Sequence, residues 1–153
     1  MLKPLVVSWG YESEQLSGST LVDYHEWWGT RDLSAFLSVP AAIEFQEQHD
    51  WDRVRADCHG LAREALNQIE RLTEIPSYYP NDDWYVQMFA AQLPDSIDVL
   101  KFKTGLYDKY RIEVPVHEWN GRKLIRVSVQ GYNTKKDIKA LINVLQCLLS
   151  ERV

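Results

Sequence analysis

Apolar positions in the first half of the chain recur at helical spacing in two stretches. From Asp50 to about Thr73 they stand three or four residues apart, which predicts a long helix that Asp50 caps. An earlier stretch, ending near residue 48, has a similar pattern and can be capped by Asp32 or Ser34. Pro40 should either kink this second helix or mark its true first turn.

The N-terminal pattern is weaker. Residues 4–9 are apolar and predict a short strand, whereas residues 10–31 have too little periodicity for a regular element, although they include four aromatic residues. Exposed aromatic rings would lack compensating contacts. We therefore expect residues 10–31 to form an ordered loop that lies against a surface.

After the proline-rich, polar segment 74–83, the pattern changes. Residues 85–94 predict a strand that ends at Pro94, and Asp95 can cap a helix that runs to roughly Lys109. Segment 74–83 is therefore the best candidate for a boundary between two sub-lobes.

A hairpin and a final helix complete the second half. The segments YRIEVPVHEW and RKLIRVSVQ flank Asn120-Gly121, a strong hairpin signal, and Pro115 should place the first of these strands at an edge or a bulge. Thr134 and Asp137 have capping-box spacing before an amphipathic helix. The whole pattern predicts an α+β fold, in which long helices are followed by a small antiparallel sheet with helices packed on one side.

Composition and charge narrow the class of protein. The 153 residues are 45% hydrophobic and 25% charged, which is typical of one folded domain or of two sub-lobes. The net charge of -5, without a long basic run, argues against binding to nucleic acid or to an anionic membrane. The N-terminus resembles neither a signal peptide nor a membrane span, so we expect a cytoplasmic protein. Cys58 and Cys147 are interpreted as small core residues.

Common catalytic and metal-binding motifs are absent from the sequence. It contains no HExxH motif, no Cys/His cluster, no G-x-S-x-G elbow and no glycine-rich phosphate loop. We therefore expect no metal site and no hydrolase-type nucleophile.

Two features suit the recognition of an anion. Gly29-Thr30 precedes a helix start, where a glycine backbone and a threonine hydroxyl could bind a phosphate and Arg31 could add charge. The alternative is that Thr30 and Asp32 only cap the helix, while Trp27 and Trp28 fill a gap in the core.

The second feature is Arg126, on an alternating strand. Its guanidinium would point away from Ile125 and Val127 and could hold a carboxylate through two hydrogen bonds. The alternative is a solvated arginine that pairs with a cross-strand acid such as Glu113.

Several segments together resemble a known family. WWGTRDLSAFLSVPAAIEF, LYDKYRIEVPV, the Asn-Gly hairpin and RVSVQGYNTKKDI resemble, in that order, the C-terminal part of class V aminotransferase-like proteins. These are fold type I enzymes that depend on pyridoxal 5'-phosphate. The chain is most similar to their isopenicillin N epimerase-like branch, and the branch is related to the cysteine desulfurases.

The resemblance implies roles for three residues. In these dimeric enzymes a Gly-Thr pair at this place reaches the cofactor phosphate in the partner subunit, which implies that Gly29 and Thr30 bind that phosphate. An arginine just before the Tyr-Asn-Thr signature binds the α-carboxylate of the substrate, which implies that role for Arg126. No residue of this chain is expected to be catalytic.

The resemblance also implies what the chain lacks. In the family, the lysine that holds the cofactor covalently and the acid that pairs with its ring nitrogen belong to a large upstream domain, and no lysine here has a matching context. We therefore expect residues 1–34 to be the end of a truncated large domain with the cofactor-facing loop, 35–76 to be connecting helices, and 77–153 to be the small α+β domain. The sequence is interpreted as a fragment, a split gene product or a truncated relative.

Two functions remain open at this point. The chain could be part of an enzyme that transforms an amino acid, by epimerisation, transamination or sulfur transfer, together with a separate large-domain chain. It could instead be a non-catalytic interaction module that keeps the small-domain fold. Either way we expect the isolated chain to be inactive, not to bind the cofactor covalently, and to self-associate through apolar residues left without a partner.

Overall fold

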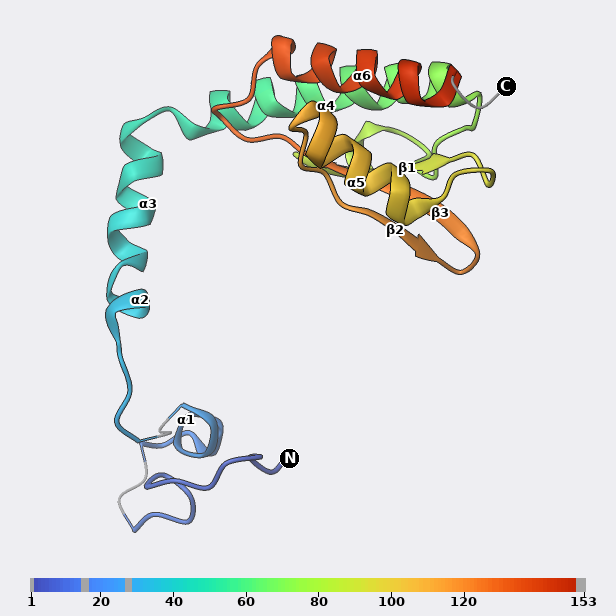
Figure 1. The fold of residues 1–153 in the computed structure, drawn as a ribbon. Helices are drawn as coiled ribbons and strands as arrows, with labels where there is room; N and C mark the ends of the chain where they lie inside the picture. The colour runs from blue at the N-terminus through green and yellow to red at the C-terminus, as the bar shows by residue number, and fades with distance from the viewer. Residues whose placement is uncertain (1, 15–16, 27–28, 151–153) are drawn as a thin grey trace. The chain divides into compact units, whose positions relative to one another are not determined.

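The computed structural model describes residues 2–14, 17–26 and 29–150, and the chain divides into two compact units, Met1–His49 and Asp50–Val153. Each unit is described by itself (Figure 1). Trp27 and Trp28, which the sequence suggested as packing residues, lie outside the described residues.

The described part of the first unit contains three helices, α1 (Thr20–His25), α2 (Ser34–Leu37) and α3 (Val39–Gln48). The described part of segment 4–9 is not a strand, so that prediction was wrong. A strand needs a partner to satisfy its backbone groups, and no described segment pairs with it. Helix α1 lies inside the stretch expected to be a loop. With six residues it is too short to display an apolar stripe, and the Ser19 hydroxyl caps it by accepting from the Val22 N–H.

Polar and backbone contacts, rather than apolar packing, shape the first unit. The only buried residues among those described here are Gly10 and Asp23. The Ser17 N–H lies 3.2 Å from both carboxylate oxygens of Asp23, and Tyr11 stacks obliquely on Tyr24 with ring centroids 4.8 Å apart. A Cβ placed at Gly10 would lie 1.9 Å from the Asp23 carbonyl oxygen, so this close approach requires glycine.

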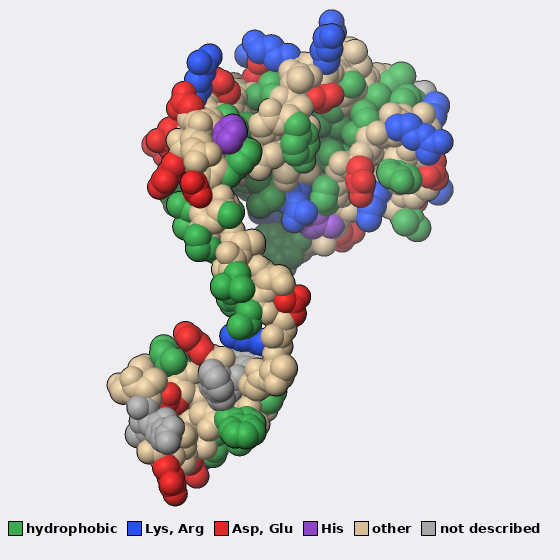
Figure 2. All heavy atoms as spheres, turned by 90° about the vertical axis from the view of Figure 1, so that its left-hand side faces the viewer, with side chains coloured by type: hydrophobic (Ala, Val, Ile, Leu, Met, Phe, Trp, Pro, Cys, Tyr) green, Lys and Arg blue, Asp and Glu red, His purple; other side chains and the backbone are tan. Residues whose placement is uncertain are grey.

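Helices α2 and α3 divide the single helix that the sequence predicted. Pro40 stands in the first turn of α3, where its missing N–H costs no hydrogen bond, so the second of the two expected roles is confirmed. Neither helix buries a side chain. Their apolar residues are among those drawn in green in Figure 2, and the exposed ones are Phe36, Leu37, Val39, Ile43 and Phe45.

The second unit is a three-stranded antiparallel sheet with three helices. Its elements are α4 (Trp51–Thr73), the 3₁₀ turn η1 (Asp82–Trp84), β1 (Met88–Leu93), α5 (Val99–Tyr110), β2 (Val116–Trp119), β3 (Arg122–Ser128) and α6 (Lys135–Ser150). The strand order is β1-β3-β2, with β3 in the centre. Helix α4 packs on β1 and on α6, and α5 packs on β2 (Figure 1). The predicted α+β fold is confirmed.

The hairpin forms at the predicted place. Asn120 and Gly121 both have positive φ, 50° and 71°, as a tight two-residue turn requires. Pro115 immediately precedes β2, which is an edge strand as expected, and its carbonyl oxygen accepts from the Arg126 N–H at 2.9 Å.

One face of the sheet and the inner sides of the helices form the core of this unit. Phe89 lies opposite Val127, and Ala91 lies opposite Ile125, which also pairs with Val116 of β2. All five side chains are buried. The buried helix residues that meet them include Ala62, Ala65, Leu66, Ile69, Phe102, Leu106, Ile138, Leu141 and Leu145. The apolar stripes predicted for α4 and α6 therefore face the core.

Helix caps were predicted less well than helices. Asp50 is the N-cap residue of α4, but it has a left-handed backbone and no capping hydrogen bond from its side chain. The cap of α5 is Asp98, whose carboxylate accepts from the Lys101 N–H at 3.0 Å, so the choice of Asp95 was wrong. The turn after Pro94, closed by the Ile97 N–H donating to the Pro94 carbonyl, delays the helix by one turn.

The start of α6 follows the predicted capping box in part. The Asp137 carboxylate accepts from the Thr134 N–H at 2.7 Å and from its hydroxyl at 3.0 Å. Cys147, expected in the core, is exposed. It stands two residues after buried Leu145, which places it on the other side of the helix. Among the described residues, no helix is both long and apolar enough to cross a membrane.

Candidate functional site

The Gly29-Thr30 loop belongs to the first unit. Gly29 has φ of 92°, a left-handed value that favours glycine, and Thr30 is exposed. Thr30 does not cap the following helix. The N-cap residue of α2 is Leu33, without a side-chain capping bond, so neither Asp32 nor Ser34 is its cap. The Asp32 carboxylate, one residue earlier, accepts from the Ser34 N–H at 2.9 Å and from the Ser34 hydroxyl at 2.6 Å. The bond from the Ser34 hydroxyl, then that from its N–H, lowers the pKa of Asp32.

The Arg31 guanidinium in this loop lies over the Phe36 ring, 4.7 Å from its centroid. Thr30, the residue before Arg31, is exposed.

Arg126 stands on β3, the central strand, on the face opposite the core. Its cross-strand neighbour on β1 is Ala90, and its N–H donates to the carbonyl of Pro115, the residue before β2. Among the described residues, no carboxylate lies within 4.0 Å of its guanidinium, so the alternative in which Arg126 pairs with Glu113 is not realised.

The face around Arg126 carries no acid on the strands. The side chains that share this face, reading from the strand register, are Met88, Ala90, Gln92, His117, Trp119, Arg122, Leu124 and Ser128. None is negatively charged, and Met88, His117 and Ser128 are exposed. An exposed guanidinium on such a face can donate hydrogen bonds to a carboxylate from outside the chain.

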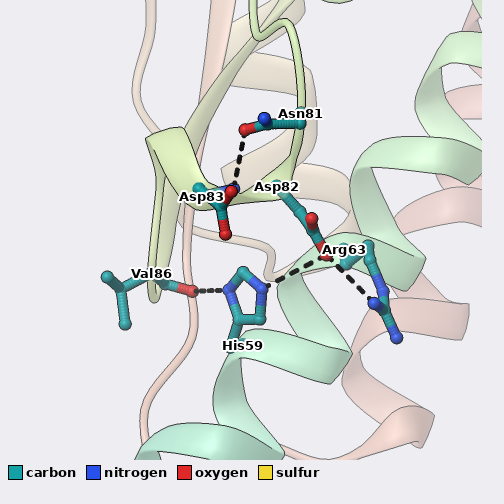
Figure 3. Close-up of polar contacts among 6 residues, drawn as sticks. All are labelled: His59, Arg63, Asn81, Asp82, Asp83 and Val86. Carbon is teal, nitrogen blue, oxygen red and sulfur yellow. Dashed lines mark hydrogen bonds and ion pairs between the residues drawn. The ribbon is translucent and has the colours of Figure 1, made fainter.

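The sequence reading did not anticipate a polar cluster between α4 and the segment before β1. The Asp82 carboxylate oxygen Oδ2 accepts from Arg63 at 3.0 Å and lies 3.5 Å from His59 Nε2. The other ring nitrogen, Nδ1, lies 3.0 Å from the Val86 carbonyl oxygen (Figure 3). Because a carbonyl can only accept, Nδ1 carries a hydrogen.

Two pKa shifts follow from this arrangement. The hydrogen bond from Arg63 holds the pKa of Asp82 below its usual range, with a smaller contribution from His59. Burial raises the pKa of Tyr85, whose ring centroid is 5.4 Å from that of His59. Asp82 is therefore charged and Tyr85 neutral near neutral pH.

A hollow of about 520 Å³ separates the first half of α4 from the loop before α6. Polar residues on both sides already have partners, as in the contact between Lys135 and Glu64 at 3.8 Å. Cys58 at its wall is 4% exposed, and burial raises the pKa of its thiol, so a reactive thiolate is disfavoured. Within the described ranges, no three His, Cys, Asp or Glu residues gather as a metal site would need.

The predicted site residues thus fall in both units. Gly29 and Thr30 belong to Met1–His49, and Arg126 belongs to Asp50–Val153. The cluster of His59, Arg63 and Asp82 was missed, because Asp82 lies in an irregular segment far along the chain from α4. The one available signal was the spacing of His59 and Arg63, which puts them on one helix face.

The chain is similar in sequence to two known epimerases. The chain is 34% identical to the isopenicillin N epimerase of Amycolatopsis lactamdurans over 95% of its length, and 29% identical to that of Streptomyces clavuligerus over 98%. It spans 39% and 40% of these relatives. No family model matches the chain.

Two further matches are more distant. A probable chloroplastic L-cysteine desulfhydrase of Arabidopsis thaliana is 27% identical over 88% of the chain, which spans 31% of that protein. Among solved structures, the 8-amino-7-oxononanoate synthase of Francisella tularensis superposes with a TM-score of 0.62 at 16% identity. That superposition covers 88% of this chain and 39% of the synthase, and it shows a shared fold.

Together these matches confirm the resemblance to fold type I proteins of the class V aminotransferase and epimerase kind, a family that depends on pyridoxal phosphate.

Proposed function

We propose that this chain forms the carboxylate-recognising part of a pyridoxal-phosphate-dependent enzyme that transforms an amino acid. The similarity to two isopenicillin N epimerases over nearly the whole chain supports this class of reaction. The chain spans about 40% of those relatives, so the proposed enzyme works together with a further polypeptide region, which supplies the lysine that holds the cofactor.

The observation that carries the proposal is the environment of Arg126. Arg126 is exposed on the central strand, on the face opposite the core, and its cross-strand neighbour on β1 is the small residue Ala90. A planar guanidinium without an internal acid can offer two parallel N–H groups to a carboxylate. We infer that Arg126 binds and orients the α-carboxylate of the substrate.

The proposed phosphate contact is made by Gly29 and Thr30. Their geometry fits this role, because the left-handed backbone at Gly29 removes a side chain from the approach and the Thr30 side chain is exposed. The nearest side-chain atom to a Cβ added at Gly29 would be the Ser8 hydroxyl, 3.4 Å away. In the assembled enzyme this loop would donate hydrogen bonds to the cofactor phosphate of a partner subunit.

When bound, the cofactor would withdraw electrons from the substrate Cα. Arg126 would bind the substrate carboxylate, and Thr30 would bind the phosphate of a cofactor held by the partner subunit. No residue of the chain is assigned a proton-transfer role.

We also propose that the apolar residues of α2 and α3 contact another polypeptide. Phe36 and Leu37 are 59% and 75% exposed, and no residue of either helix is buried. Clustered apolar side chains at a surface commonly mark an interface. Either a second copy of this chain or a separate large-domain chain would bury them, and sedimentation at micromolar concentration distinguishes self-association from a monomer.

The test uses a stable conjugate of cofactor and amino acid, N-(5'-phosphopyridoxyl)-L-alanine, titrated into the full chain and followed by ¹H-¹⁵N NMR. We expect shifts centred on the β3 amides around Arg126. Arg126→Ala should weaken binding about tenfold or more, because a hydrogen-bonded charge pair is lost. The matched control is Arg122→Ala, which removes the same charge from the same face of β3 and should leave binding within about twofold.

A second ligand identifies the group that is recognised. The same conjugate made with ethylamine lacks the carboxylate, and the wild-type chain should bind it as weakly as Arg126→Ala binds the alanine conjugate. Equal binding of both conjugates to the wild-type chain would contradict the proposal.

A further inference from the structure

The cluster of His59, Arg63 and Asp82 lies outside the proposed binding site and rests on separate observations. It joins helix α4 to residues 82–86, which precede β1. The His59 ring makes two contacts with this segment, one to Asp82 at its start and one to the Val86 carbonyl at its end. Between these two contacts lies the turn η1 (Figure 3).

The hydrogen-bond chemistry of the ring differs between its two protonation states. The Val86 carbonyl requires a hydrogen on Nδ1, so in the neutral ring Nε2 holds a lone pair. That lone pair would face the Asp82 carboxylate oxygen, which is also an acceptor, at 3.5 Å. In the protonated ring both nitrogens donate, and the same geometry becomes two favourable contacts.

The charged groups around the ring come from both elements. From the segment, Asp82 is negative and Tyr85 remains a neutral phenol, since burial raises its pKa. From α4, Arg63 is positive and opposes a second positive charge, but it approaches Asp82 from a different side than the ring does (Figure 3). Cys58, next to His59 in the helix, is a neutral thiol, because burial raises its pKa.

The residues just before this segment, Tyr78 and Tyr79, contact the free edge of the sheet, and the Tyr79 ring lies 5.0 Å from the Tyr85 ring of the segment. Strand β1 is an edge strand, and the N–H of Ala90 in its outer row donates to the Tyr79 hydroxyl at 2.9 Å. The Tyr78 hydroxyl donates to the Gln92 side chain further along the same strand. A sheet edge without such a cover exposes unpaired N–H and C=O groups.

We propose that His59 is a pH-dependent contact. When its ring is protonated, its two hydrogen bonds hold residues 79–86 against the edge of β1, and when the ring is neutral, this segment is held less firmly. The acid limit of the effect is set by Asp82. Its pKa is lowered by Arg63, so its stabilising charge is present above the usual carboxylate range and is lost as the pH falls through the lowered value. The contact between the ring and Asp82 is therefore favourable while the ring is protonated and the carboxylate is charged.

Amide hydrogen exchange of the full chain at pH 5.5 and pH 8.0, corrected for the intrinsic pH dependence of exchange, tests the proposal. The Ala90 amide reports on the covered edge, and the Asp83 amide, which donates to the Asn81 side chain, reports on the turn η1. We expect both to be protected about two- to fivefold more at pH 5.5, the range that partly exposed ion pairs give. The Leu141 amide in α6 serves as the reference and should not change.

Variants assign the effect to the ring. In His59→Asn the side-chain amide can still donate one hydrogen bond but cannot gain a proton, so the pH dependence at Ala90 and Asp83 should disappear. His117→Asn, on the exposed edge strand β2, is the matched control and should keep it. If His59→Asn keeps the wild-type pH dependence, or if the wild type shows none, the proposal is wrong.

A direct measurement on the wild-type ring covers the case in which His59→Asn does not fold. Histidine ring ¹⁵N shifts distinguish the two neutral tautomers. We expect the neutral His59 ring to carry its hydrogen on Nδ1, and a ring that carries it on Nε2 would overturn the proposal.

Discussion

The two units of this chain differ in whether they bury their apolar side chains. The described part of Asp50–Val153 buries twenty apolar side chains, including Phe89, Phe102 and Leu145. In the described part of Met1–His49 no apolar side chain is buried, although residues such as Leu5, Trp9 and Phe36 are large and hydrophobic. The second unit therefore has a core of its own, whereas the described apolar side chains of the first unit are not buried.

The largest expected difference between the units is in the cost of removing an apolar side chain. Phe102→Ala removes a side chain that is 2% exposed and should reduce the free energy of unfolding by about 3–5 kcal/mol. Ile43→Ala in α3, where the side chain is 54% exposed, should change it by less than about 0.5 kcal/mol. Urea unfolding followed by circular dichroism measures both. A comparable loss from Ile43→Ala would show that α3 belongs to a folded core.

A single methyl group should disrupt the first unit alone. Gly10→Ala places a Cβ 1.9 Å from the Asp23 carbonyl oxygen, and the overpacking should cost about 1–3 kcal/mol locally. NMR amide shifts of residues 8–25 should change, while those of β1, β3 and α6 stay the same. Gly18→Ala is a partial control, because its φ of 89° strains the backbone but no atom lies near its Cβ. Shifts throughout α4 to α6 would contradict the independence of the units.

Two glycines in the second unit should respond with opposite signs. Gly121→Ala forces alanine into the left-handed turn at φ of 71° and should destabilise the chain by about 1–2 kcal/mol. Gly60→Ala fits the interior of α4, where nothing lies within 4 Å of the added Cβ, and should stabilise it by about 1 kcal/mol. Thermal unfolding measures both, and equal signs would argue against the hairpin geometry at Asn120-Gly121.

The smallest expected effect is the difference in unfolding free energy between substitutions at two N-cap residues, Asp98 of α5 and Asp50 of α4. Asp98→Ala loses the hydrogen bond from the Lys101 N–H and should cost about 1 kcal/mol. Asp50→Ala removes no capping bond from its side chain, so its cost should come only from the left-handed backbone and remain below that of Asp98→Ala. Equilibrium unfolding in urea gives both values. The reverse order would mean that Asp50 caps α4 in solution.

Local patterns in the sequence predicted the second unit well. The stripe of α4, the Asn120-Gly121 hairpin and the face of α6 each depend on residues a few positions apart, so spacing alone indicated them. Asp95 was misassigned as a cap because α5 begins one turn later than expected. Cys147 was expected to be buried, but a small rotation along α6 decides whether its side chain faces the core or the solvent. Spacing is less reliable there.

The first unit was predicted less well for a different reason. An apolar run at 4–9 predicts a strand only if another strand pairs with it, and the sequence of this unit supplies none. The family resemblance supplied what local patterns could not, because it assigned Gly29, Thr30 and Arg126 to a site that depends on other parts of an assembly. Those three roles remain predictions.

The sequence by itself determined the long helices, the tight hairpin and the family resemblance. Helices follow from the spacing of apolar residues, the hairpin follows from its two turn residues, and the resemblance follows from similarity along most of the chain. Only the tertiary structure decided that no acid of the described strands lies beside Arg126, since that depends on which residues β1 and β2 bring to the same face. It also decided that His59 meets Asp82 and the Val86 carbonyl at once, because those groups lie more than twenty residues away and come together only when α4 packs beside the edge of the sheet.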